Sequence, residues 1–246
     1  MKLSKDILLL LLVLIGAAAA GMWVLNMDAQ VTPAQEDSVS EEVSAQQNAP
    51  IQYSPNREGI NTRGTGAQEI RQEFEKVVNG FLQDLNTRMN EYGRKRGTVR
   101  EIIQPDNMRL YEYVKDNESV ARTLMAELEA EQDEIVNMFA TADEQMKPLL
   151  KLMNSNDAET LLREWDVTRK EQLNEYKRFF ESERKLYDLY RVILEVYVES
   201  GGAYQVDLES EQDETSVNFD DAELQNTYDA AKSSAEDILN NRSVLE

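Results

Sequence analysis

Two long runs of apolar residues at helical spacing constrain the fold of this chain more than any other feature. The first run extends over about 117–153 and the second over about 158–200, and apolar side chains recur in both every three or four residues. A polar turn, Asn154-Ser155-Asn156-Asp157, separates the runs, and Gly201-Gly202 ends the second. Helices joined by so short a turn must lie antiparallel, so the sequence predicts a helical hairpin about 60 Å long.

Two further amphipathic helices flank this hairpin. Thr65-Gly66-Ala67-Gln68 matches a capping box, and apolar side chains then recur through 67–92, so this helix needs a partner surface and is expected to pack on the hairpin. Gly93 and Gly97 predict a break that ends it. The last helix is expected to begin at a cap on Asp220. Its face includes several alanines, so it should dock weakly.

The predicted fold class is therefore all-α, an elongated antiparallel helical bundle or coiled-coil hairpin behind an N-terminal membrane helix and a disordered tether. Composition agrees, because the chain is rich in helix-forming residues and has only 10 glycines and 5 prolines. The predicted units are a membrane anchor or signal peptide at 1–27, a disordered acidic linker at 28–64, the helical bundle at 65–202, and an acidic loop with the C-terminal helix at 203–246.

The N-terminal stretch 7–25 contains no charged residue and follows Lys2 and Lys5. A helix of that length spans about 28 Å, close to one hydrocarbon core, and the apolar character continues past a small-residue site at Ala18-Ala19-Ala20 that a signal peptidase would favour. An uncleaved anchor and a cleaved signal peptide both fit, and we favour the anchor. In either case the basic side is cytoplasmic and the bulk of the chain lies outside, in the periplasm or at the cell surface.

Composition excludes several classes of function. The chain has no histidine and no cysteine, which removes imidazole metal ligands, Ser-His or Cys-His catalysis and disulfides. We found no phosphate-binding loop, metal motif or cofactor motif, and we expect no enzyme, no metal and no cofactor. A net charge of −21 argues against nucleic-acid binding. The acidic run 207–214 lacks the glycine of an EF-hand loop, so a formed calcium site is not expected there.

One basic cluster stands out in this acidic chain. It comprises Arg94, Lys95, Arg96 and Arg100 and is predicted to occupy a glycine-flanked loop, where it is a candidate site for an anion or an acidic partner. The plainer interpretation is that these cations terminate a helix or pair with the acidic residues 203–246, which contain 12 acidic and 2 basic side chains.

Aromatic residues on the longest predicted helix form a second candidate site. Trp165, Tyr176, Tyr187 and Tyr190 are candidates for an interhelical ligand pocket, although this spacing is more typical of a packed bundle seam. The leading functional hypothesis is a membrane-tethered, non-enzymatic protein that binds other envelope proteins, with a homodimer through the long helices as a further option. The alternative is an extracytoplasmic ligand-binding sensor with a pocket at these aromatics.

Overall fold

The computed structural model describes residues 67–152, 156–208 and 215–242. These ranges are mostly helical, which confirms the all-α prediction at the level of fold class. None of the helices within them is long and apolar enough to cross a membrane. The predicted anchor at 7–25 and the predicted linker at 28–64 lie outside the described residues.

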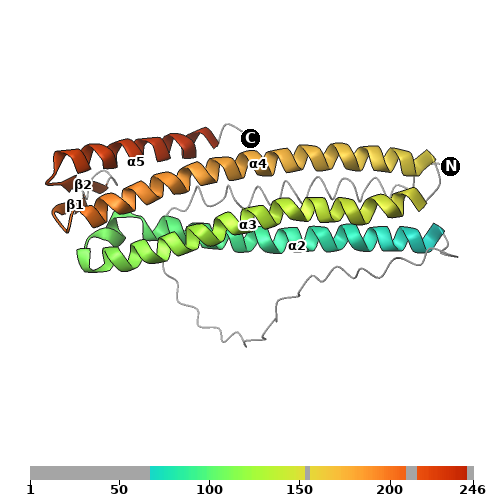
Figure 1. Cartoon of the computed structure of the whole chain (residues 1–246), viewed down its shortest axis with the longest axis horizontal. Helices are drawn as coiled ribbons and strands as arrows, with labels where there is room; N and C mark the ends of the chain where they lie inside the picture. The colour runs from blue at the N-terminus through green and yellow to red at the C-terminus, as the bar shows by residue number, and fades with distance from the viewer. Residues whose placement is uncertain (1–66, 153–155, 209–214, 243–246) are drawn as a thin grey trace, which may run out of the picture.

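Four α-helices, one 3₁₀ helix and one β-hairpin make up the described part of the chain (Figure 1). In chain order they are α2 (Ala67–Ile102), η2 (Pro105–Met108), α3 (Tyr111–Leu152), α4 (Asn156–Glu199), β1 (Tyr204–Leu208), β2 (Thr215–Phe219) and α5 (Ala222–Arg242). The predicted hairpin of long helices corresponds to α3 and α4, and glycines 201 and 202 end α4 with φ angles of 60° and 91°.

Helix α2 is longer than the sequence predicts, because Gly93 and Gly97 do not interrupt it. Each glycine costs a helix roughly 1 kcal/mol relative to alanine, but the residues around them are held by packing. Tyr92 and Val99 have no exposed surface, and Arg96 is also buried. Burial of these side chains against α3 and α4 outweighs the local preference for a break.

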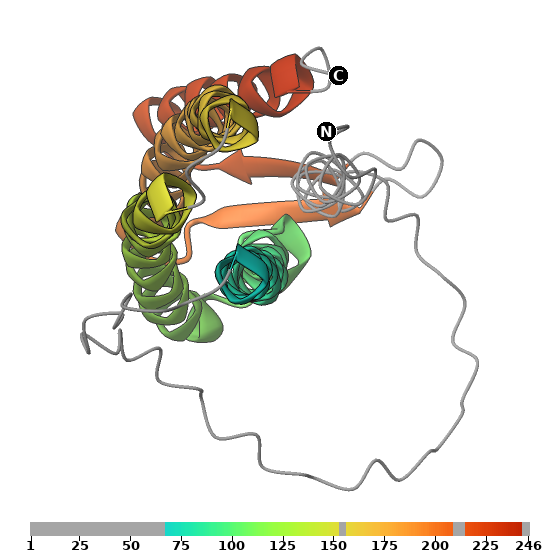
Figure 2. The ribbon, with the colours of Figure 1, turned by 90° about the vertical axis from the view of Figure 1, so that its right-hand side faces the viewer.

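The helices pack side by side in the order α2, α3, α4 and α5. Seen end-on, they form a curved row (Figure 2), and the β-hairpin lies at one end of the long axis of the bundle (Figure 1). Large side chains of α2, α3 and α4 meet in the core: Phe81 of α2 stacks edge-on against Phe139 of α3 at 5.2 Å and against Trp165 of α4 at 6.3 Å between ring centroids.

The segment that the sequence assigned to an acidic loop, 203–218, instead contains two strands. β1 and β2 pair antiparallel, with Tyr204 opposite Phe219 and Val206 opposite Val217. The rings of Tyr204 and Phe219 pack against Tyr197 of α4, at 5.1 Å and 5.4 Å between centroids. The loop prediction was wrong here because it weighed the acidic residues and overlooked the period-two alternation of apolar side chains.

The cap of α5 is one residue later than predicted. The Oδ1 atom of Asp221, not of Asp220, accepts hydrogen bonds from the backbone N–H groups of Glu223 and Leu224, at 2.8 Å and 3.2 Å. The predicted face of α5 is otherwise confirmed, because Tyr228, Ala231 and Ala235 are buried against the bundle.

Candidate functional site

The four basic residues Arg94, Lys95, Arg96 and Arg100 lie on one continuous helix, α2, and not in a loop. Their side chains leave the helix in different directions, because successive residues are rotated by about 100°. Arg94 is exposed, Lys95 and Arg100 are half-buried, and Arg96 is buried. The structure therefore does not gather the four charges into one cradle for an anion, and the loop prediction was wrong.

Arg96 instead forms the centre of a buried polar network. Its Nε lies 3.0 Å from Oε2 of Glu183 on α4, and the Glu183 side chain has no exposed surface. The Tyr187 hydroxyl donates to the same carboxylate oxygen at 2.8 Å. The Gln132 amide of α3 donates to the Tyr92 hydroxyl at 2.9 Å, and the two tyrosine hydroxyls lie 2.9 Å apart. Three helices therefore contribute to one buried polar network around the Glu183 carboxylate.

Lys95 is held by a separate group of acids on the adjacent surface. Its Nζ lies 3.2 Å from Glu127, 3.5 Å from Glu131 and 3.8 Å from Glu91. Burial opposes the charge of Lys95, but the hydrogen bond to Glu127 and the charges of the three acids raise the pKa of its ammonium group. The sequence suggests the acidic residues 203–246 as partners of the four cations. Two of these cations, Lys95 and Arg96, instead form ion pairs with acids of α3 and α4.

The geometry of the Arg96–Glu183 network favours a structural role. Polar atoms of Arg96, Glu183, Tyr92, Tyr187 and Gln132 contact one another in the core, and burial raises the pKa of both tyrosine hydroxyls, so these remain neutral donors. A buried ion pair of this kind fixes the register of the helices that carry it, because any shift would leave a charge unpaired.

The four aromatic residues proposed as a ligand pocket do not surround one cavity. Trp165 and Tyr190 are 25 residues apart on α4, which corresponds to about 37 Å along the helix. Trp165 packs on Phe81 and donates to Asp143 at 3.1 Å. Tyr176 packs on Phe139, while Tyr187 belongs to the polar network. The rings are core residues distributed along the bundle.

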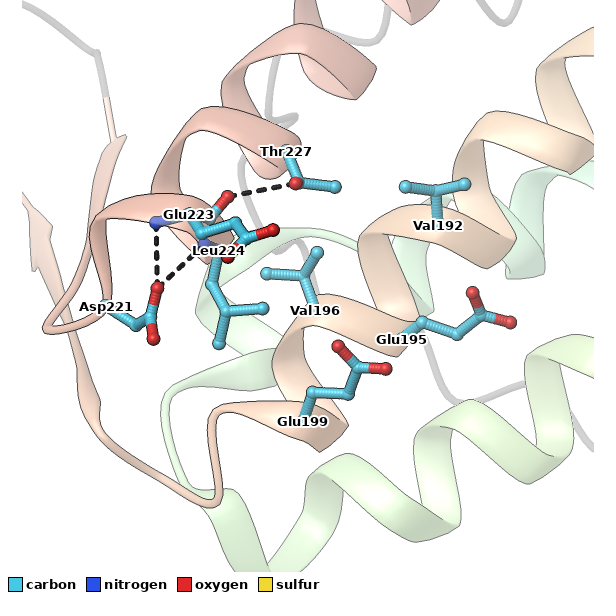
Figure 3. Close-up of a pocket in the computed structure, with 8 residues that line it drawn as sticks. All are labelled: Val192, Glu195, Val196, Glu199, Asp221, Glu223, Leu224 and Thr227. Atoms are coloured by element: carbon cyan, nitrogen blue, oxygen red, sulfur yellow. Dashed lines mark hydrogen bonds between the residues drawn. The ribbon is translucent and has the colours of Figure 1, made fainter.

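A surface groove that the sequence did not reveal lies between the C-terminal end of α4 and the N-terminal end of α5 (Figure 3). Its volume is about 340 Å³, near the lower end of the range for ligand pockets. Aliphatic groups come from both helices and carboxylates stand around them. The lining residues are Val192, Glu195, Val196, Glu199, Asp221, Glu223, Leu224 and Thr227.

Two of the four carboxylates in the groove already have partners in the fold. Oε1 of Glu195 accepts from Arg122 at 2.8 Å, and Asp221 caps α5. Within the described part of the chain, no cation pairs with Glu199 or Glu223, and both side chains are exposed. The groove therefore combines an apolar floor with uncompensated negative charge at its rim.

The carboxylates of the groove do not form a metal site. Among the described residues there is no group of three or more Asp, Glu, His or Cys side chains that could hold a metal ion. Most of the acidic run 207–214, namely 209–214, lies outside the described residues.

Sequence reasoning missed the groove because its walls come from segments about 25 residues apart that lie side by side only after the chain reverses at the hairpin. The available signal was the pair of exposed acids Glu195 and Glu199, one turn apart and flanked by valines, close to a second acidic segment that begins α5.

Comparison with known proteins gives no family assignment. No protein-family model, curated protein or solved structure matches this chain.

Proposed function

We propose that this chain is an exported, membrane-tethered protein that acts without catalysis by binding another protein of the cell envelope through the α4–α5 groove. The observation that carries this proposal is the groove itself, where an accessible apolar floor and a carboxylate rim occur together. A non-enzymatic role agrees with the absence of histidine and cysteine from the chain.

The position of the groove supports a role in contact with other proteins. The chain enters the bundle at Ala67, and the groove lies at the opposite end of the long axis (Figure 1). Helix α2, with 36 residues, spans about 54 Å of that axis. If 7–25 anchors the chain and 28–64 acts as a flexible linker, Ala67 marks the tethered end of the bundle and the groove lies at its free end, where a partner can approach it.

A ligand-binding sensor is the weaker proposal. Its candidate pocket residues are separated along α4 and are engaged by neighbouring core side chains, as described above. A homodimer is likewise a proposal. A second copy of the chain would compete with the partner protein for the exposed surfaces of the bundle.

Site-specific photocrosslinking in intact cells tests the proposed function. A photoreactive residue replaces Thr227, which lines the groove and is exposed, and the control position is Asn174, which is exposed on α4 away from it. We expect one discrete adduct from position 227 and none from position 174. The adduct should be lost when Leu224→Gln makes the floor polar, while circular dichroism remains unchanged. Equal adducts from both positions, or none from position 227, would refute the proposal.

A further inference from the structure

We propose that the α4–α5 groove binds a cationic segment of a partner protein, with one aliphatic side chain on the floor and lysine or arginine at the rim. This inference rests on the proposed function and specifies the chemistry of the partner.

The floor provides an apolar surface for one side chain. Val192 and Leu224 are half-buried and remain accessible, while Val196 lies beneath them with 2% of its surface exposed. The Thr227 hydroxyl donates to the backbone carbonyl of Glu223 at 2.9 Å, so it is occupied within α5. Its methyl group points across the groove toward Val192 (Figure 3). A leucine or isoleucine of a partner would contact aliphatic atoms from both helices.

The rim selects a positive charge. Glu199 and Glu223 approach the floor from α4 and from α5 respectively, and neither pairs with a cation in the described part of the chain. They belong to the most acidic region of the sequence, because 203–246 contains 12 acidic and 2 basic residues. A cationic segment is therefore attracted over a Debye length of about 8 Å, and an anionic one is repelled.

A protein segment fits these observations better than a metal ion. The carboxylates are too dispersed to coordinate one ion, as the absence of a metal-binding group among the described residues shows. The apolar floor also has no role in binding a hydrated cation. A lysine or arginine beside an aliphatic residue uses both the rim and the floor, and the alkyl stem of the basic side chain adds apolar contact.

The basic residues nearest the start of the bundle cannot fill the groove from within the same molecule. Arg57 and Arg63 precede Ala67 by ten residues or fewer, which reach at most about 36 Å when extended. The groove lies beyond the whole of α2, about 54 Å away along the bundle. Lys95 and Arg96 are paired with acids of α3 and α4. The occupant is therefore expected to come from another molecule, and the net charge of −21 disfavours a second copy of this chain.

A designed peptide tests this chemistry on the full-length chain in nanodiscs of zwitterionic lipid, with empty discs as the blank. The probe is a fluorescent alanine-based helix of about four turns that carries one leucine flanked, one turn away on each side, by lysine. Binding is followed by fluorescence anisotropy at low and physiological salt. The groove variant is Glu199→Gln with Glu223→Gln. The matched control is Glu171→Gln with Glu181→Gln, two exposed acids on α4 more than about 25 Å from Glu199.

We expect the groove variant to weaken peptide binding about five- to tenfold and the control variant to leave it nearly unchanged, because both raise the net charge equally and only one removes the rim. A peptide with glutamate in place of lysine should not bind. Equal losses in both variants would mean nonspecific attraction and would overturn the inference. Loss of self-association in the groove variant alone, measured by sedimentation, would identify a second copy as the occupant and overturn it too. If the peptide fails to bind while position 227 still crosslinks to a partner, the partner chemistry is wrong and the proposed function stands.

Discussion

Replacing Arg96 with methionine should destabilise the protein far more than the loss of an ordinary ion pair, because it leaves a carboxylate buried without its counter-charge. The Glu183 side chain has no exposed surface, and Arg96 is its cationic partner at 3.0 Å. Removing one member of a buried pair costs about 3–5 kcal/mol of folding free energy. For a folded region of this size each kcal/mol shifts Tm by roughly 2–4 °C, so Tm should fall by roughly 6–20 °C.

The matched control is Arg88→Met, which removes another α2 arginine that pairs with an acid of α3. The Arg88 and Glu134 side chains are 40% and 59% exposed, so this pair should contribute only about 0.2–1 kcal/mol. Both variants lose one positive charge and gain the same side chain. Urea and thermal unfolding, followed by far-UV circular dichroism, measure the difference between them.

The double variant Arg96→Met with Glu183→Leu distinguishes the cost of losing the ion pair from the cost of leaving one buried charge without a partner. It removes both charges. The remaining loss of folding free energy then comes from the hydroxyls of Tyr92 and Tyr187, which lose the Glu183 carboxylate as an acceptor. An unsatisfied buried hydroxyl costs about 1–3 kcal/mol, and these two still contact each other. We therefore expect the double variant to be more stable than Arg96→Met alone. If the double variant is no more stable than Arg96→Met alone, or if Arg96→Met costs no more than Arg88→Met, the buried pair does not act as described.

Three further predictions concern other parts of the molecule. Burial raises the pKa of the Tyr92, Tyr176 and Tyr187 hydroxyls above their ordinary value of 10.0, so the folded state retains protons that the unfolded chain releases. The stability that these buried hydroxyls contribute should be fully present below pH 10, and the free energy of unfolding should decrease above it. Phenolate absorbance should then appear together with unfolding. Phenolates that form while the helices persist would contradict this. Gly202→Ala should cost more in urea unfolding than Gly201→Ala, because a Cβ at 202 would lie 3.2 Å from atoms of Tyr111 while none lies within 4 Å at 201. Finally, the full-length protein should stay with membranes through an alkaline carbonate wash, and a mature N-terminus at Gly21 would instead establish a cleaved signal peptide.

The long helices could be predicted because their apolar residues repeat with a single period over many turns. The predicted second run, about 158–200, agrees closely with α4 (Asn156–Glu199), and its end at glycines 201 and 202 follows from their positive φ angles. The end of α2 could not be predicted in the same way. Local preference places a break at Gly93, and only contacts with residues about 90 positions away, such as Glu183 and Tyr187, keep the helix intact.

The role of the basic cluster was also beyond local reasoning. In sequence, Arg94, Lys95 and Arg96 look equivalent, but the rotation of the helix directs the first to solvent, the second to acids of α3 and the third into the core. A hydrophobic stripe shows which helix face is buried, and it gives no indication that an arginine will be buried there. That outcome requires a matching carboxylate on a distant helix, which a single sequence does not specify.

Ion pairs of the described residues join α3 to α4 and leave carboxylates at the α4–α5 groove without cationic partners. Arginines 122, 184 and 191 join α3 to α4 through Glu195, Asp133 and Glu129. Within the described residues no ion pair joins α5 to α4, and the buried face of α5 consists of Tyr228, Ala231 and Ala235, supported by the ring of Phe219 at 5.3 Å from Tyr228. These three arginines thus fix α3 against α4. The α4–α5 seam is held by aromatic rings and alanines, and at its groove Glu199 and Glu223 have no cationic partner within the described residues, which is the property that a cationic partner requires.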